Sequence, residues 1–270
     1  MMIALKSSLK LNWRPWRRYV LLGGLAYGFF LLQQTPISLI YPLAKDVIEQ
    51  QNIRIYGLEG GLWDGSAQRV EYQGRAFENV EWDVHPLALL IGQLSATVSV
   101  GNDNMRIHAT VNRSLTGSIS LDDISGRISA NEVMTLAQVP AVKLDGQFKL
   151  DMDHLDLSDG RLQSAEGTLV WSHAGMQFPL KLDLGELSID VETVDAGVRA
   201  SLGDKGGPLE LRGQLLIQPD GAYSFDAQLS AREGVGSSLG RTIGMLGSYN
   251  SQGKVDVKSN GKLAELGLGG

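Results

Sequence analysis

Hydrophobic and polar residues alternate along most of the chain beyond residue 45. Val80, Trp82 and Val84 are separated by single acidic residues, and the same two-residue period recurs over Met105–Val111. This period is that of a β-strand with one apolar and one polar face. Short runs rich in glycine, aspartate and proline separate such segments and are typical of tight turns. The pattern predicts an all-β domain over residues 45–270, built from about a dozen antiparallel strands.

A sheet that is apolar on one side has to bury that side. We therefore predict an antiparallel, strongly curved multi-strand sheet in the form of a trough, a sandwich or an open barrel. A trough with an open apolar groove would hold an acyl chain, so a membrane-anchored protein that binds or passes lipid in envelope biogenesis is one functional hypothesis. Helical patterns are few. One lies at His85–Ile91, one at Ser129–Gln138 with the capping-box spacing of Ser129 and Glu132, and residues 236–247 are ambiguous.

The N-terminal part of the chain differs from the rest. Residues 1–18 contain five lysine or arginine residues and no acid, and residues 19–44 contain no charged side chain. An apolar run of this length matches the thickness of a bilayer core, and positive residues stay on its cytoplasmic side. We predict a basic cytoplasmic tail over 1–18, a single transmembrane anchor over 19–40 and a periplasmic β-rich domain over 45–270.

A cleaved signal peptide is the alternative for the N-terminal segment. Cleavage after Ala44 would place Pro42 at the third position before the cut, where a small residue is needed, so we favour an anchor that stays attached. Within the anchor, Gly24 and Gly28 have the spacing of small residues that let two membrane helices approach closely. They are our candidates for a helix–helix contact in the membrane.

Charge and cysteine content narrow the functional classes. All 30 acidic residues but only 19 of the 24 basic residues lie beyond residue 18, so the main body is acidic. A basic tip on an acidic body argues against nucleic acid as a partner and points to a membrane. The absence of cysteine excludes disulfides and thiolate metal sites.

No catalytic constellation stands out in the sequence. The stretch GSSLG at 236–240 has the letters of a nucleophile elbow around Ser238, but that motif needs an α/β sheet and a later histidine, and the last histidine is His173. The aspartates of LDMDHLDLSDG, residues 150–160, do not fit a calcium loop, and the apolar register shift within them indicates a bulge. We predict no catalytic residue, no cofactor and no metal site. A hydrolase that uses Ser238 is the enzymatic alternative.

Two segments carry a resemblance to a known family. The stretch LEGGLWDGSAQRV covers residues 58–70, and VEWDVHPLALLIGQLSATVSV covers residues 80–100. They resemble the type II secretion system protein N family, also called general secretion pathway protein N. The residues that match its motifs are Gly61, Leu62, Trp63, Gly65, Ala67, Trp82, Pro86, Gly92 and Leu94.

The resemblance implies an inner-membrane protein of Gram-negative bacteria whose mass is mostly periplasmic. It implies a role in the export of folded proteins, with other inner-membrane or periplasmic subunits of the type II secretion system as partners, and no enzymatic activity. In physical terms, the glycines of the first motif permit turns or bulges, and Trp63 and Trp82 provide large apolar anchors for the core. Contact with a partner or a lipid is the alternative role of the two tryptophans.

Overall fold

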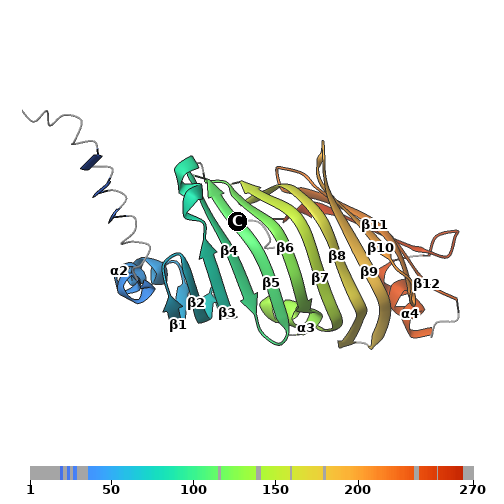
Figure 1. The fold of residues 1–270 in the computed structure, drawn as a ribbon. Helices are drawn as coiled ribbons and strands as arrows, with labels where there is room; N and C mark the ends of the chain where they lie inside the picture. Colours follow the sequence, from blue (N-terminus) through green and yellow to red (C-terminus); the bar gives the residue numbers. More distant parts are fainter. Residues whose placement is uncertain are drawn as a thin grey trace, which may run out of the picture.

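The computed structural model describes residues 19–20, 23–24, 27–28, 36–114, 117–137, 141–158, 160–178, 181–233, 237–247 and 249–263. Within these residues, thirteen strands form one antiparallel sheet in which every strand pairs with its neighbour in sequence (Figure 1). The strands are β1 Ile53–Gly60, β2 Asp64–Tyr72, β3 Arg75–Val84, β4 Gln93–Gly101, β5 Met105–Ser114, β6 Ile119–Ser129, β7 Lys143–Ser158, β8 Arg161–Phe178, β9 Leu182–Val194, β10 Gly197–Asp204, β11 Leu209–Ile217, β12 Ala222–Ala231 and β13 Val255–Lys262.

The sheet is open, with β1 and β13 as its two edges. The predicted all-β antiparallel fold is confirmed, but the strong curvature and the sandwich and barrel forms are wrong, because one layer of strands neither closes nor curls strongly. Short connections place each strand beside the one before it, so the sheet grows in one direction and the last strand never returns to the first. The regular twist between neighbouring strands turns the layer without joining its edges.

Beyond residue 35, the described part of the chain contains four helical elements besides the sheet. They are α2 Ile37–Gln50, the 3-10 helix η1 Pro86–Ile91, α3 Ala130–Leu136 and α4 Ser237–Leu246. The predicted N-cap is confirmed, because the Ser129 hydroxyl accepts a hydrogen bond from the Glu132 backbone N–H at 3.2 Å. The Ser129 N–H bonds to the Asn104 carbonyl at 2.7 Å and not to the Glu132 side chain that a full capping box requires. The helical turn predicted at 85–91 is η1, and the ambiguous segment at 236–247 is α4.

Helix α2 overlaps both predicted domain boundaries. The predicted anchor ends at residue 40 and the predicted β domain begins at residue 45, whereas Pro36 directly precedes a helix that runs from Ile37 to Gln50. Proline is well suited to this position, because residues at a helix start have no intrahelical partner for their N–H groups. The first strand therefore begins only at Ile53.

The predicted anchor over 19–40 and the tail over 1–18 lie largely outside the described residues. Among the residues that the structure does describe, no helix is both long and apolar enough to cross a bilayer. Gly24 and Gly28 are helical, and a Cβ atom added at either would meet no atom of the chain within 4 Å. Their predicted contact with another helix stays a prediction.

The two faces of the sheet differ in chemistry. Directly paired residues of an antiparallel ladder point to the same side, and the pairs Trp82–Val98 and Leu169–Ile189 are apolar. We call the side that carries these residues and Leu150 the apolar face. The fully buried core is concentrated at its C-terminal part, where α4 packs on β9 and on β11–β13 and forms a cluster. Its members are Leu182, Leu209, Leu211, Ala227, Leu239, Ile243 and Val255.

A histidine between two carboxylates lies on the opposite, polar face. In β7, His154 Nδ1 lies 2.6 Å from Asp122 Oδ1, and its Nε2 lies 2.8 Å from Asp156 Oδ2. The hydrogen bond to Asp122, and then that to Asp156, raise the pKa of His154 above its ordinary value, and desolvation offsets part of this effect. Both carboxylates favour the protonated imidazole, and the charge-assisted contact with Asp122 of β6 joins β6 and β7.

This contact predicts a pH dependence of stability. The pKa of His154 in the folded state exceeds the unfolded value of about 6.5. The stabilisation of the folded state by the protonated imidazole is therefore fully present below about pH 6.5 and is lost as the pH rises through the folded pKa. The melting temperature of the purified full-length protein should therefore fall over this window, and His154→Gln should flatten the fall. His108→Gln is the matched control, because His108 contacts the Ser99 hydroxyl at 2.8 Å instead of a carboxylate. An unchanged slope in His154→Gln would contradict the prediction.

Candidate functional site

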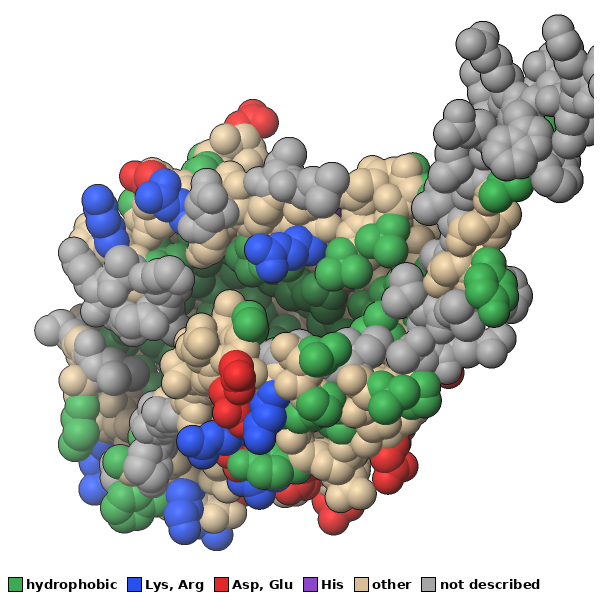
Figure 2. Space-filling model, turned by 90° about the vertical axis from the view of Figure 1, so that its left-hand side faces the viewer, with side chains coloured by type: hydrophobic (Ala, Val, Ile, Leu, Met, Phe, Trp, Pro, Cys, Tyr) green, Lys and Arg blue, Asp and Glu red, His purple; other side chains and the backbone are tan. Residues whose placement is uncertain are grey.

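No described element forms a second layer over the middle of the apolar face. Trp82, Val98, Leu150, Leu169 and Ile189 all keep part of their surface accessible, although they lie in central strands. Figure 2, which views the molecule from the left-hand side of Figure 1, shows a hollow with hydrophobic side chains deep inside it. A contiguous accessible apolar surface of this kind is typical of a binding site for an apolar ligand or a partner.

The two ends of the strands are covered differently. Successive antiparallel strands alternate in direction, so α3, which links β6 to β7, and α4, which precedes β13, lie at the same end (Figure 1). There, Arg75 Nε of β3 donates a hydrogen bond to the Leu136 carbonyl at 2.6 Å and ties the C-terminus of α3 to the far side of the hollow. Ala130 of α3 is fully buried. We call this the α3 end, and the opposite one, where η1 lies, the η1 end.

The residues of the first sequence motif gather at the η1 end of β1–β3. Gly61 donates its N–H to the Asp64 carbonyl at 2.7 Å in the β1–β2 turn, and the Trp63 carbonyl accepts from Val84 N–H at 2.6 Å. The Leu62 carbonyl lies 3.4 Å from Trp82 Nε1, which donates to it. The motif therefore builds the corner at which the first three strands are joined.

Gly65 and Trp82 are paired across β2 and β3 on the apolar face. A Cβ atom added at Gly65 would lie 2.5 Å from Trp82 Cζ2 and 2.8 Å from the Gly61 carbonyl oxygen. The indole thus occupies the space that any side chain at Gly65 would need. Next to this pair, Ala67 is 1% exposed and lies opposite Val80. This small residue lets the motif corner pack closely.

The residues of the second motif shape the connection between β3 and β4. Pro86 is the first residue of η1, and Gly92 ends it in the left-handed conformation with φ 74°. Leu94 follows in β4 opposite Arg113 of β5 and is 49% exposed. The structure brings both motifs to the same end of the first strands, as neighbours in space.

Comparison with known proteins agrees with this arrangement. The family model of the type II secretion system (T2SS), protein N matches residues 51–258, which include β1 to β12 and the first half of β13. The chain belongs to the type II secretion system protein N family. The resemblance inferred from the two motifs is confirmed, and the family makes the chain a component of that secretion system.

Relatives within the protein N family cover most of the chain. It is 27% identical over 246 residues to the type II secretion system protein N of Vibrio cholerae serotype O1, a match that covers 89% of this chain and 97% of the relative. It is 23% identical over 247 residues to the protein of the same name from Aeromonas hydrophila, covering 88% and 95%. No solved structure matches the chain.

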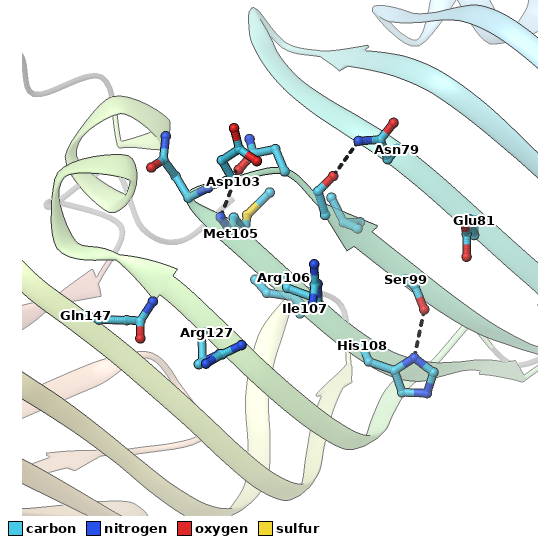
Figure 3. Close-up of a pocket in the computed structure, with 14 residues that line it drawn as sticks. Asn79, Glu81, Ser99, Asp103, Met105, Arg106, Ile107, His108, Arg127 and Gln147 are labelled. Atoms are coloured by element: carbon cyan, nitrogen blue, oxygen red, sulfur yellow. Dashed lines mark hydrogen bonds between the residues drawn. The ribbon is translucent and has the colours of Figure 1, made fainter.

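The polar face carries a second hollow, of about 820 Å³, lined by residues from β3 to β7 (Figure 3). Arg106, Arg127 and Lys149 form a row on β5, β6 and β7 in which each is directly opposite the next. None of these three described side chains forms a salt bridge with another described residue. Like charges directly opposite one another are unfavourable, so this row fits contact with an acidic surface. Sequence analysis missed it, because its members become neighbours only through the register.

The sequence motifs considered for catalysis and metal binding lie in the following elements of the fold. Ser238 lies in α4, which follows the antiparallel strand β12 and not a strand of an α/β sheet. The predicted bulge in residues 150–160 is confirmed between Met152 and His154 within a continuous β7. In the described part of the chain, no group of three or more histidine and acidic side chains is arranged to hold a metal ion.

The contact between Gly65 and Trp82 predicts an effect on stability. Gly65→Ala should lower the free energy of unfolding by about 1–3 kcal/mol, because the added methyl group forces the indole from its place. Chemical unfolding of the purified full-length protein, followed by tryptophan fluorescence, measures the change. Gly101→Ala is the control, because a Cβ there would meet its nearest atom, the Met105 carbonyl oxygen, at an ordinary 3.7 Å. Equal effects of the two variants would show that the indole contact has no special role.

Proposed function

We propose that this chain is an inner-membrane-anchored, periplasmic and non-catalytic component of the type II secretion system. It contributes to the export of folded exoproteins by contacting other inner-membrane or periplasmic subunits. Membership of the protein N family supports the assignment to the secretion system. The five basic residues before an uncharged run of residues 19–44 support an anchor with the N-terminus in the cytoplasm.

The observation that carries the subunit contact is an uncovered stripe on α2. Leu39, Leu43 and Val47 are spaced four residues apart, so they lie along one side of the helix. They are 66%, 86% and 61% exposed. The helix packs beside β1, an edge strand, and its first residues, 37–40, overlap the predicted anchor over 19–40. An apolar stripe of this kind is what a partner subunit with a hydrophobic groove would bind.

Site-specific crosslinking tests the subunit contact. A photoreactive residue at Leu43 of the full-length protein, expressed in cells that secrete an exoprotein, should capture another subunit of the secretion system, identified by mass spectrometry. Lys45 is the control on the same helix, because it extends away from the stripe and forms a salt bridge with Glu49. Capture of no secretion subunit from Leu43 under secreting conditions, or the same captured protein from both positions, would contradict the proposal.

A second candidate function is the binding or passage of lipid. The observation that favours it is the accessible apolar face, which lies on the other side of the sheet from the basic row and has the width of several strands. An acyl chain lying along this face would remove apolar surface from water without needing directed hydrogen bonds. Lipid binding and subunit contact use different surfaces, so one chain accommodates both.

Native mass spectrometry of the full-length protein tests lipid binding. The protein released from several detergents should retain phospholipid, and Leu150→Gln in the middle of the apolar face should lower the retained fraction because it places an amide against the acyl chain. Lys149→Gln is the matched control, since this neighbouring residue points to the polar face. Melting curves establish that both variants are folded. A lipid-free mass for the parent protein, or equal retention in both variants, would contradict the lipid function.

A further inference from the structure

The helix η1 presents the most exposed group of large hydrophobic side chains on the sheet domain. Leu87, Leu90 and Ile91 are 74%, 82% and 74% exposed, and η1 has no buried residue. The sequence segment from 84 to 102 has no lysine, arginine, aspartate or glutamate. Three such side chains on one short turn, without a charged neighbour in sequence, are costly in water and call for an apolar environment.

The turn is held in a fixed shape, as a docking element requires. His85, directly before η1, has its N–H bonded to the Ser95 carbonyl at 2.8 Å. The two ring nitrogens of His85 lie 3.2 Å from the Ser95 hydroxyl and 3.3 Å from the Thr97 hydroxyl. Gly92 ends the turn with its N–H bonded to the Leu89 carbonyl. The apolar side chains therefore extend from a base that is tied to β4.

The position of η1 shows which environment it meets. Pro36, the residue at which the uncharged N-terminal segment reaches the domain, forms a β-bridge with Gly61 at the η1 end of the sheet. From Gly61 the backbone contacts lead through Trp63 to Val84, two residues before η1. Three strand spacings of about 4.8 Å separate Pro36 from η1. Pro36, where the N-terminal segment reaches the domain, and η1 therefore lie roughly 15 Å apart at the same end of the sheet.

A cation accompanies the apolar turn. Arg113, the last residue but one of β5, lies on the apolar side of the sheet, directly opposite Leu94, and is exposed. It forms no salt bridge with any described residue. An arginine beside exposed leucines is the combination found where proteins touch a bilayer, because the stem lies among apolar groups and the guanidinium reaches a lipid phosphate.

We propose that η1 inserts Leu87, Leu90 and Ile91 into the periplasmic surface of the bilayer that holds the anchor. The inference rests on the anchor of the proposed function, since that anchor brings the η1 end to the membrane. It sets the orientation of the sheet: the strands stand on the membrane, the η1 end faces the lipid, and the α3 end, closed by its helix, faces away. The hollow then opens at the bilayer surface.

The rival orientation places α2 on the membrane. Its stripe of Leu39, Leu43 and Val47 is also apolar, but α2 begins at the η1 end and runs along β1 to the α3 end. A sheet lying on α2 would point η1 along the membrane surface and leave its leucines in water. The two orientations therefore make opposite predictions for Leu43 and Leu90.

The absence of cysteine makes this test direct, because a single introduced cysteine labels one position of the full chain. An environment-sensitive fluorophore is attached to the new cysteine in each of three variants, Leu90→Cys, Leu43→Cys and Asn131→Cys. Asn131 is the control, because it is exposed and lies on α3 at the other end of the strands. Each full-length protein is reconstituted into phosphatidylethanolamine and phosphatidylglycerol vesicles. Emission is then compared in vesicles with and without nitroxide-labelled lipid, placed either near the headgroup or near the chain terminus.

The expected result is a blue-shifted emission at position 90 that nitroxide near the headgroup quenches more than nitroxide near the chain terminus. Positions 43 and 131 should keep the emission of a fluorophore in water. Quenching at 43 without quenching at 90 would overturn the inference in favour of the rival orientation, and no quenching at any position would overturn it outright. An alkaline wash separates this failure from that of the proposed function. Release of the protein from the vesicles would show that the anchor is absent, whereas retention without quenching at 90 would leave the anchor intact.

Discussion

A one-layer sheet with an apolar side is the constraint on which the rest of this structure depends. Folding removes apolar surface from water, and each square ångström left exposed forgoes about 25 cal/mol of stabilisation. Helix α4 and the C-terminal strands satisfy this requirement at one side, where Leu239 and Ile243 are each 3% exposed. Over the central strands no described element does so, and Trp82, Leu150 and Leu169 stay accessible. This uncovered surface is what the proposals of lipid binding and partner contact rest on.

Two neighbouring β-bulges keep the apolar face continuous across the long strands. Between β5 and β6 the register shifts at Asp123, a non-glycine residue with φ 52°, and between β7 and β8 it shifts at Asp153. Because β6 and β7 stay in register with one another, the two extra residues lie side by side in the middle of the sheet. The shift lets Leu121 and Ile124 both reach the apolar side, and it places Asp122 against His154 on the other side.

Local patterns foretold much of the fold. The period of two identified the strands, the spacing of Ser129 and Glu132 identified α3, and the apolar register shift after Met152 identified the bulge in β7. The same three-residue step from Leu121 to Ile124 was present in the sequence and would have identified the matching irregularity in β6. Helix α2 was missed because Pro36 suits the end of one helix and the start of the next equally well, and only contacts with β1 decide between them.

The shape of the sheet and the candidate site could not be obtained in this way. Alternation tells which side chains share a face, but the same alternation serves a closed barrel, a sandwich and an open layer, because closure depends on how the edges meet. The contact of Trp82 with Gly65 and the row of Arg106, Arg127 and Lys149 exist only through cross-strand register. The two family motifs were found as separate strings, although they form one corner at the η1 end.

The proposals for membrane, lipid and subunit contact follow from one asymmetry between the two ends of the strands. At the α3 end, the hydrogen bond from Arg75 to the Leu136 carbonyl places a helix terminus beside β3. At the η1 end, the described part of the rim includes Leu94, Arg113 and η1, which offer apolar contact and a cation. A lipid that leaves the bilayer with its acyl chains first would enter the hollow from this end. Its headgroup would follow, and its phosphate would stay near Arg113. The stripe on α2 lies outside that route, so a partner bound there would hold the domain upright without blocking the hollow.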